Sequence, residues 1–345
     1  MGKKLYILVL LLIASLLLAA CGARGSGGGQ SAGSDKTYEL RVSFVVNIES
    51  PKGQAAQRFK ELVESRSNGR ITVTLYPSST LYGDNNEIQA IQTGAVEMLL
   101  PSSSKFSTIT NKFQVLDLPF LINSLDELPQ VLAPDTKVGK LLYENEDIEA
   151  HNMKVLGMFP DGMMQIAANK EIRSPEDLKG MRFRIQPADV IKSIYSAWGA
   201  QTVVIALGEL YTALQQGIAD GHENTYAVIY GSKAHEVQKF IVETDHRVNV
   251  GIAVINKPFF DSLPPDLQEV VSKAAQEAGL YCLQISAEQN AEFKKKIIEA
   301  GTTQVLELTP EEREAFKRAV VPKVWDEYAS VLGQDVIEDL KAKMG

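Results

Sequence analysis

The chain has 345 residues, of which 45% are hydrophobic and 23% charged, an ordinary composition for a globular protein. Its formal net charge of −8 argues against a nucleic-acid partner and provides no basic surface for a membrane. Single hydrophobic cores stop growing near about 250–300 residues, so we expect two lobes rather than one.

The first 21 residues have the layout of a secretory signal. Lys3 and Lys4 precede a nearly unbroken apolar run at 5–20, and small residues lead to Cys21. The run is short for a helix that must cross about 30 Å of hydrocarbon. Its Leu-Ala-Ala-Cys ending resembles the bacterial lipobox, which implies removal of residues 1–20 and a membrane anchor of lipid on Cys21. An ordinary secretory signal cut near the same point, or an uncleaved anchor, is the alternative.

Residues 21–36 are rich in glycine and serine and have nothing to bury, which is typical of a flexible tether. The folded body is expected to begin between Lys36 and Tyr38. Cys282 is the only other cysteine, so this body has no internal disulfide.

The first half of the body alternates strand and helix patterns. A helix is expected after Ser50, with Asn68-Gly69 as its turn, and a second helix is stopped by Gly94. Short connections in a β-α-β-α-β order predict a parallel sheet covered by helices. The expected strands are 38–46, 71–75 and 96–100, and the expected second helix is 85–93.

The same order restarts after residue 150. Strands are expected at 154–158, 181–185, 201–206 and 248–255, and helices at 190–198 and 210–214. The pattern from 264 to 300 is helical almost throughout, long enough to connect two lobes as a strut. We therefore predict an α/β protein with two lobes, a cleft between them and a long helix that spans both.

No common catalytic motif is present in the sequence. It has no G-x-S-x-G elbow, no G-x-G-x-x-G, no P-loop and no H-E-x-x-H, and its four histidines are not at metal-ligand spacing. We expect no cofactor, no metal and no catalytic residue. The alternative is a secreted lyase or hydrolase that uses His222 and Glu223, although neighbours on a strand point to opposite faces.

The most informative internal segment is the strand at 181–185. Alternation puts Arg182 and Arg184 on one face, and Pro187 ends the strand. Ligands of open α/β sheets bind beyond the carboxyl ends of strands, where Arg184 lies. Its planar guanidinium binds a carboxylate through two hydrogen bonds. A solvated or internally paired arginine is the alternative.

Short motifs spread over most of the chain resemble the solute-binding subunit of TRAP (tripartite ATP-independent periplasmic) transporters. The chain is similar in particular to the C4-dicarboxylate-binding, or DctP-type, branch. The matching segments are SPKGQAA at 50–56, SNGR at 67–70, YP at 76–77, LYGD at 81–84, DLPF at 117–120, LKG at 178–180 with Arg184, Tyr211 with ALQ at 213–215, DG at 220–221, EN at 223–224 and HEVQK at 235–239.

This resemblance implies an extracytoplasmic receptor with a periplasmic-binding-protein-like fold. Its two lobes close on a small organic acid and deliver it to the TRAP permease membrane subunits. The implied lobes are 37–161 with 250–289, and 162–249 with 290–345. The implied ligand-binding residues are Arg184, Asn224, Gln165, Phe44, Ser102, Ser103 and Met164.

The position of Met164 departs from the pattern of the family. Many relatives have a second cation there, whereas Met163 and Met164 are apolar. Burial of an unpaired carboxylate is costly. The site therefore favours a monocarboxylate, unless Lys105 supplies the second charge. A receptor that serves a sensor protein rather than a permease fits the same residues.

Overall fold

The computed structural model describes residues 36–344, and the chain from Thr37 onward forms one compact unit. The predicted signal peptide at 1–20, the lipidation site Cys21 and the tether up to residue 35 lie outside the described residues. Among the described helices, none combines the length and apolar character needed to cross a membrane.

Two β-sheets organise the body, as the α/β prediction requires. The first has the strand order β2-β1-β3-β10-β4, and the second has the order β11-β9-β5-β8-β6-β7. The first sheet contains β1 (Tyr38–Ser43), β2 (Ile71–Tyr76), β3 (Met98–Leu99), β4 (Met153–Met163) and β10 (Val248–Asn256). The second contains β5 (Gln165–Ala168), β6 (Arg182–Ile185), β7 (Gln201–Val204), β8 (Gly221–Asn224), β9 (Phe240–Glu243) and β11 (Gln304–Glu307).

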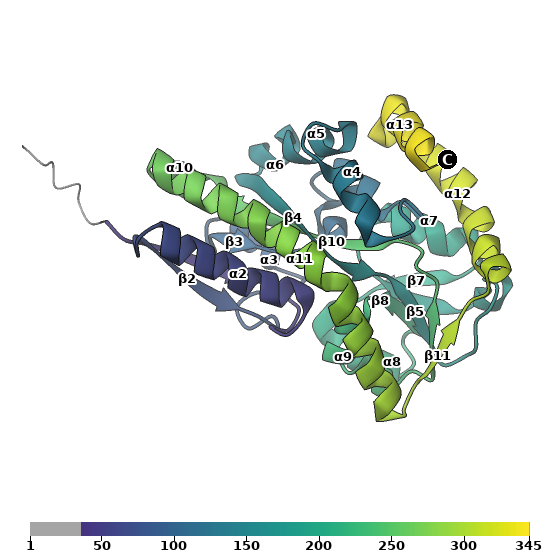
Figure 1. Ribbon diagram of the computed structural model, residues 1–345. Coiled ribbons are helices and arrows are strands. Elements are labelled where there is room, and N and C mark those ends of the chain that lie inside the picture. The colour runs from purple at the N-terminus through teal and green to yellow at the C-terminus, as the bar shows by residue number, and fades with distance from the viewer. Residues whose placement is uncertain (1–35, 345) are drawn as a thin grey trace, which may run out of the picture. The chain divides into compact units, whose positions relative to one another are not determined.

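Helices cover both sheets (Figure 1). They are α2 (Pro51–Arg66), α3 (Glu87–Gln92), α4 (Leu128–Leu132), α5 (Lys137–Tyr143), α6 (Glu146–Ala150), α7 (Asp189–Ala197), α8 (Leu210–Gln215), α9 (Tyr226–Gly231), α10 (Lys257–Ser262), α11 (Pro265–Ala300), α12 (Pro310–Leu332) and α13 (Gln334–Met344). The segment between β3 and β4, to which the sequence analysis assigned no element, contains α4 to α6 and short 3-10 helices.

The predicted parallel pairing at the start of the body is confirmed. β1 pairs in parallel with both β2 and β3, because α2 and α3 each return the chain to the same end of the sheet. β10 then enters the sheet antiparallel between β3 and β4. A segment from far along the chain thus completes the first sheet, and β4 ends, and β10 begins, next to strands of the second sheet.

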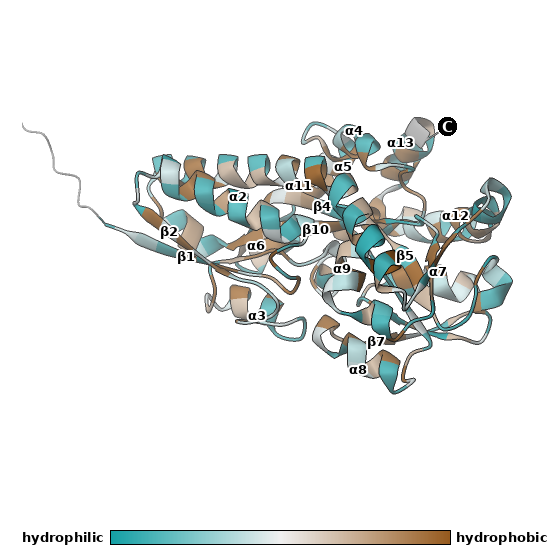
Figure 2. Cartoon of the chain, turned by 60° about the horizontal axis from the view of Figure 1, so that its bottom comes forward, coloured by the Kyte–Doolittle hydropathy of each residue, from teal (hydrophilic) through white to brown (hydrophobic). Residues whose placement is uncertain are grey.

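Ser50 is the N-cap residue of α2, as its position in the sequence indicates. Its side-chain oxygen accepts a hydrogen bond from the backbone N–H of Gly53 at 3.1 Å, and Pro51 occupies the first turn. Polar and apolar residues alternate along α2 and α11, as expected for helices buried on one side (Figure 2).

The predicted long helix is confirmed as α11. It packs against β4 and α2 of the first sheet and against α9 beside the second, so it contacts both halves of the body (Figure 1). The helix lies close to the sheet at Gly279, where a Cβ atom would fall inside van der Waals contact with the carbonyl oxygen of Met158. A larger side chain at this position would separate the helix from β4.

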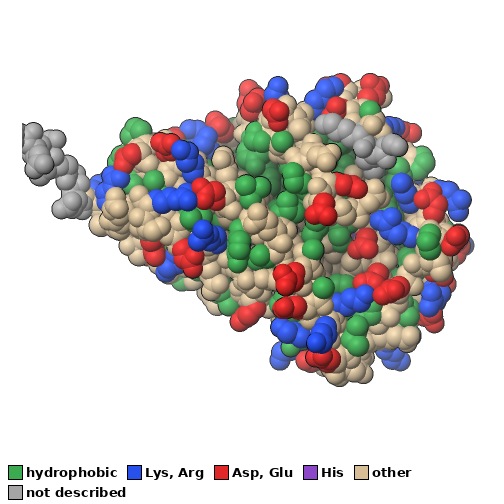
Figure 3. Space-filling view, in the orientation of Figure 1, with side chains coloured by type: hydrophobic (Ala, Val, Ile, Leu, Met, Phe, Trp, Pro, Cys, Tyr) green, Lys and Arg blue, Asp and Glu red, His purple; other side chains and the backbone are tan. Residues whose placement is uncertain are grey.

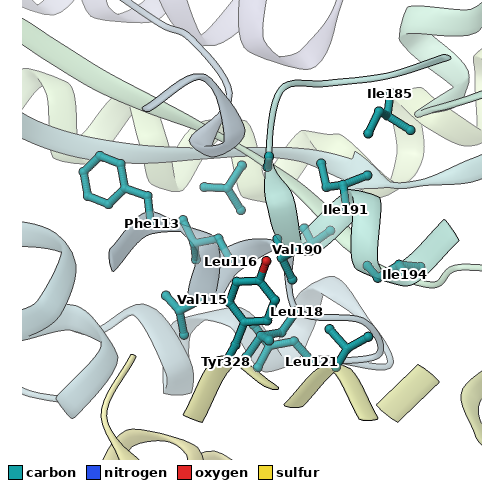
Figure 4. Close-up of a cluster of buried hydrophobic side chains, with 14 of the residues drawn as sticks. Phe113, Val115, Leu116, Leu118, Leu121, Ile185, Val190, Ile191, Ile194 and Tyr328 are labelled. Carbon is teal, nitrogen blue, oxygen red and sulfur yellow. The ribbon is translucent and has the colours of Figure 1, made fainter. Parts of the chain in front are cut away.

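One hydrophobic core continues from the first sheet to the helices of the second. Figure 4 shows Leu116 beside Val190 of α7 and Tyr328 of α12. Phe113 and Ile194 lie on either side of these residues and belong to the same cluster. All of these side chains are buried. The two halves therefore share apolar contacts and are not joined by the strands alone.

Candidate functional site

A small polar cavity lies where loops after β1 and β3 face the ends of β6 and β8. Its volume is about 20 Å³, close to the space that one water molecule needs. A four-carbon acid is larger than this, so the walls must separate before such a ligand enters. The charged side chains that line the cavity are Lys52, Asp84, Lys105 and Arg184, and the amides are Gln186, Asn224 and Asn249.

Like Lys52, Arg184 is deeply buried, with 1% of its surface exposed. Its Nε donates a hydrogen bond to the carbonyl oxygen of Ile205 at 2.8 Å, and its Nη2 lies 3.9 Å from a carboxylate oxygen of Asp84. Its Nη1 has no hydrogen-bond partner among residues 36–344. An unpaired buried guanidinium nitrogen is costly, and an acceptor oxygen in the cavity would satisfy it.

Asp84 connects the two walls of the cavity. One of its oxygens lies 2.8 Å from Lys105 Nζ, and the other accepts a hydrogen bond from the backbone N–H of Leu207 at 2.6 Å. Burial alone would raise the pKa of Asp84, but Lys105, the Leu207 N–H and Arg184 outweigh burial and hold the pKa below its ordinary value. This carboxylate is therefore ionised, and it lies between two of the cations, Lys105 and Arg184.

Lys52 approaches the cavity from the first turn of α2. Its Nζ lies 3.4 Å from Asp161, which also accepts a hydrogen bond from Asn249 at 2.7 Å. The side chain passes over Gly251, where a Cβ atom would lie 2.8 Å from the lysine Cε. Glycine at this position of β10 thus gives Lys52 its path to the cavity.

Hydrogen bonds also join the two walls of the cavity directly. Ser104 donates to the Gln186 side-chain oxygen at 2.7 Å, and the Gln186 amide donates to Ser102 at 3.3 Å. Ser107 also donates to the carbonyl oxygen of Pro187. Ser102 to Ser107 follow β3, whereas residues 186–187 follow β6, so these bonds must break if the lobes separate.

A second buried network lies behind the cavity. Arg247, just before β10, binds Glu223 on β8 and donates from Nη1 to Asp117 at 2.9 Å. His246 Nε2 lies 2.6 Å from Glu223, and Ser103 donates to Asp117 at 3.2 Å. Glu223 is the chain neighbour of Asn224, and Ser103 is the chain neighbour of Ser102, and both Asn224 and Ser102 line the cavity. The network therefore fixes the positions of the two cavity walls relative to each other.

A larger hollow between α11 and α4 to α5 has a different character (Figure 3). Its volume is about 330 Å³, and it is lined by apolar side chains such as Leu128, Leu132, Leu280 and Leu283. None of its lining residues is charged. It therefore does not fit a carboxylate, and the small charged cavity is the better site for an anion.

Residues 42–331 match the family described as bacterial extracellular solute-binding protein, family 7. This match spans most of the chain. The chain belongs to this family. Relatives include the C4-dicarboxylate-binding periplasmic protein DctP of Rhodobacter capsulatus, which is 36% identical over 304 residues, or 88% of this chain and 90% of that protein.

Solved structures agree with this assignment. A TRAP periplasmic solute-binding protein from Shewanella oneidensis, with bound succinate, is 36% identical at a TM-score of 0.84, and the match covers 90% of this chain and all (100%) of that one. One from Pseudomonas aeruginosa, with bound L-malate, is 33% identical at a TM-score of 0.81, over 84% of this chain and 100% of that one. The predicted two-lobe fold is thus confirmed, and the chain is an extracytoplasmic solute-binding receptor for transport rather than an enzyme.

The structure brings three of the predicted ligand-binding residues together. Ser102, Arg184 and Asn224 all line the small cavity of this family 7 protein. Asn224 and Arg184 share a face of the second sheet, because Arg184 pairs with His222, two residues before Asn224.

The other four predicted residues do not line the cavity. Gln165 donates its amide to Asp245 at 2.7 Å. Phe44 is buried in the core of the first sheet, although its neighbours Val45 and Val46 line the cavity. Ser103 bonds to Asp117 in the second network, and Met164 is fully buried.

His222 and Glu223 do not form an acid/base pair. His222 lies on the face of Arg184, and its Nδ1 accepts a 3.1 Å hydrogen bond from the Asn224 side-chain amide, whereas Glu223 faces Arg247. Burial, helped by Arg184, lowers the pKa of His222 to about 3, so its ring is neutral. This geometry agrees with the prediction that neighbours on a strand point apart.

No role was predicted from the sequence for Lys52, Asp84, Gln186 or Asn249. Lys52 could have been singled out from the sequence. A lysine in the first turn of a helix interacts unfavourably with the helix dipole, so its presence there indicates another role. Asp84 is part of the LYGD motif but was not recognised as the partner of Lys105. The local sequence does not indicate that Asn249 lines the cavity, because its position depends on how β10 inserts into the first sheet.

Proposed function

We propose that this receptor binds a C4-dicarboxylate such as succinate and delivers it to the membrane subunits of a TRAP permease. The observation that carries this proposal is the charge of the cavity, in which Arg184, Lys52 and Lys105 surround one small space. Relatives named for C4-dicarboxylate binding, and structures with bound succinate and malate, support the same ligand class.

The two lysines would supply the second cation that the apolar side chain of Met164 does not provide. Arg184 approaches from β6 with a free Nη1, while Lys105 and Lys52 approach from the segments after β3 and β1. We propose that one ligand carboxylate binds Arg184 and Asn224, and the other binds Lys105, Lys52 and Ser102. Each charge-assisted hydrogen bond would contribute about 1.5–3 kcal/mol. A second cation at position 164 is then unnecessary.

We further propose that the lobes consist of 37–161 with 250–289 and of 162–249 with 290–345. The ligand would enter while these lobes are apart, and closure would restore the bonds between Gln186 and Ser102 to Ser104. Four further residues, Gln165, Phe44, Ser103 and Met164, would support the ligand-binding residues without belonging to the present cavity lining. The closed surface would be the form that the permease recognises.

The lipid anchor is also part of the proposal. The sequence ending at Cys21 supports acylation, and the Gly/Ser-rich residues 21–36 would let the body stand off the membrane. Replacement Cys21→Ser is expected to abolish incorporation of labelled fatty acid in cells. Undiminished labelling of the C21S protein would exclude this anchor.

Isothermal titration of residues 37–345 with succinate and with butanoate tests the ligand class. The two acids have four carbons each and differ in one carboxylate. We expect tight binding of succinate and binding of butanoate weaker by about 10-fold or more, since the loss of one charge-assisted contact removes at least about 1.5 kcal/mol. Equal affinity for both acids would contradict the proposed role of the two lysines.

A further inference from the structure

Glu87 is a buried acid that the proposed ligand contacts do not use. It is the first residue of α3 and has no exposed surface. Neither of its carboxylate oxygens has a hydrogen-bond partner among residues 36–344. Fully buried carboxylates are normally paired or hydrogen-bonded, because an ionised group without partners is costly in a low-dielectric interior.

The charged groups around Glu87 are those of the ligand cavity. Asp84 precedes it by three residues and repels its charge, whereas Lys105 and Lys52 attract it. Asp84 is itself bound to Lys105 and approached by Arg184, and Lys52 is bound to Asp161. Glu87 therefore lies behind the cavity, within the electrostatic reach of a bound ligand.

Charge balance in this cluster depends on the proton of Glu87. Three cations, Lys52, Lys105 and Arg184, face two paired acids, Asp84 and Asp161. With Glu87 ionised the six groups are neutral, and a bound dianion leaves two uncompensated negative charges in a buried space. With Glu87 protonated the groups carry one positive charge, and the dianion leaves only one negative charge.

We propose that the receptor binds a dicarboxylate together with a proton, which Glu87 accepts from solvent as the ligand enters the cavity. This inference rests on the proposed function, because the dianion is what drives the proton onto Glu87. Glu87 is a specificity-determining residue that does not touch the ligand. It makes the cavity favour a dianion near and below neutral pH and weakens binding at alkaline pH.

The titration range of Glu87 supports this coupling. Burial, with the repulsion from Asp84, raises the pKa of Glu87 to about 7 in spite of Lys105 and Lys52. A ligand carboxylate on Lys105 adds a negative charge nearby and raises this pKa further. The sign is therefore proton uptake on binding, and the uptake is largest just above pH 7.

Calorimetric titration of the full-length protein, purified in a mild detergent, with succinate at pH 7.5 tests the proposal. The titration is done in two buffers whose heats of ionisation differ, so that the difference in binding heat gives the number of protons taken up. We expect roughly half a proton per succinate for the wild type. Affinity is expected to fall roughly fivefold to tenfold from pH 7 to 8.5, a range in which carboxyls with ordinary pKa values are ionised.

Two variants separate Glu87 from other groups. Glu87→Gln keeps the volume of the side chain and removes the proton, so uptake and the loss of affinity above pH 7 should both disappear. Glu299→Gln, at an exposed position of α11, should behave as the wild type. If Glu87→Gln unfolds, an absence of proton uptake by the wild type in the two buffers would still contradict the proposal.

The outcomes distinguish this inference from the function on which it rests. Succinate binding without proton exchange, or with the same proton uptake in Glu87→Gln, would contradict the role of Glu87 and leave the proposed function intact. Proton uptake that persists in Glu87→Gln would point to Asp161 or Asp117 instead. Failure of the wild type to bind succinate at any pH would contradict both.

Discussion

Arg184 is the residue on which the proposed ligand site depends most. Replacement Arg184→Ala removes a charge-assisted contact of about 1.5–3 kcal/mol, so we expect succinate affinity to fall about 10- to 150-fold in calorimetry. Arg182→Ala is a matched control, because Arg182 lies on the same strand but is exposed at the outer end of β6. Unchanged affinity in R184A, or an equal loss in R182A, would contradict the assignment.

The low pKa of His222 predicts how the free energy of unfolding depends on pH. Its pKa of about 3 lies below the ordinary value of 6.5, so the unfolded chain binds the proton and the folded chain does not. The stabilisation is complete above pH 6.5 and is lost as pH falls toward 3. At pH 5 the loss amounts to about 2 kcal/mol of unfolding free energy.

Urea unfolding at pH 7 and pH 5 measures this effect. The fall in unfolding free energy should be smaller by about 2 kcal/mol in His222→Gln than in the wild type. His151→Gln, at an exposed position, should keep the wild-type difference. The same pH response in H222Q and wild type would show that His222 is protonated in the folded protein.

The sequence made part of the site predictable at the residue scale. Arg184 could be found because its strand, its alternation and the proline after it are all local features. Lys52 and Asp161 could not be joined in the same way, since their ion pair depends on β1 and β4 entering one sheet. Glu87 looked like an ordinary first-turn glutamate, and only its burial shows that it differs from one.

The contact between α11 and β4 decides how the long helix is held. Gly279→Ala would press a methyl group against the Met158 carbonyl, so we expect a loss of about 1–3 kcal/mol of unfolding free energy. Alanine is otherwise the better helix former by about 1 kcal/mol. Gly208→Ala, which meets open space, should cost nothing in the same urea titration. Stability retained in G279A would show that α11 shifts freely on the sheet.

Elements with a strong local pattern were predicted well. The helix predicted at 264–300 and the strand predicted at 181–185 correspond to α11 and β6, because each has a clear period and a glycine or proline near its end. The segment from Ser103 to Ala150 had no such period. Its apolar residues fill the core between the two sheets from 3-10 turns and short helices, so tertiary contacts rather than local propensity determine its course.

The whole molecule combines a shared apolar core with a polar site that must open. The core in Figure 4 continues from the first sheet to α7 and α12, whereas the cavity walls meet through a few hydrogen bonds and ion pairs. Polar contacts of this kind exchange with water at little net cost. We therefore infer that the lobes separate at the cavity and stay joined at the core, β4 and β10.

A crystal structure of residues 37–345 with succinate tests the account most directly. One carboxylate should lie within hydrogen-bond distance of Arg184 Nη1 and Asn224, and the other near Lys105 and Lys52, with Gln186 still bonded to the serines after β3. Succinate bound elsewhere, or bound in the cavity while Arg184 contacts only Ile205 and Asp84, would contradict the central claim.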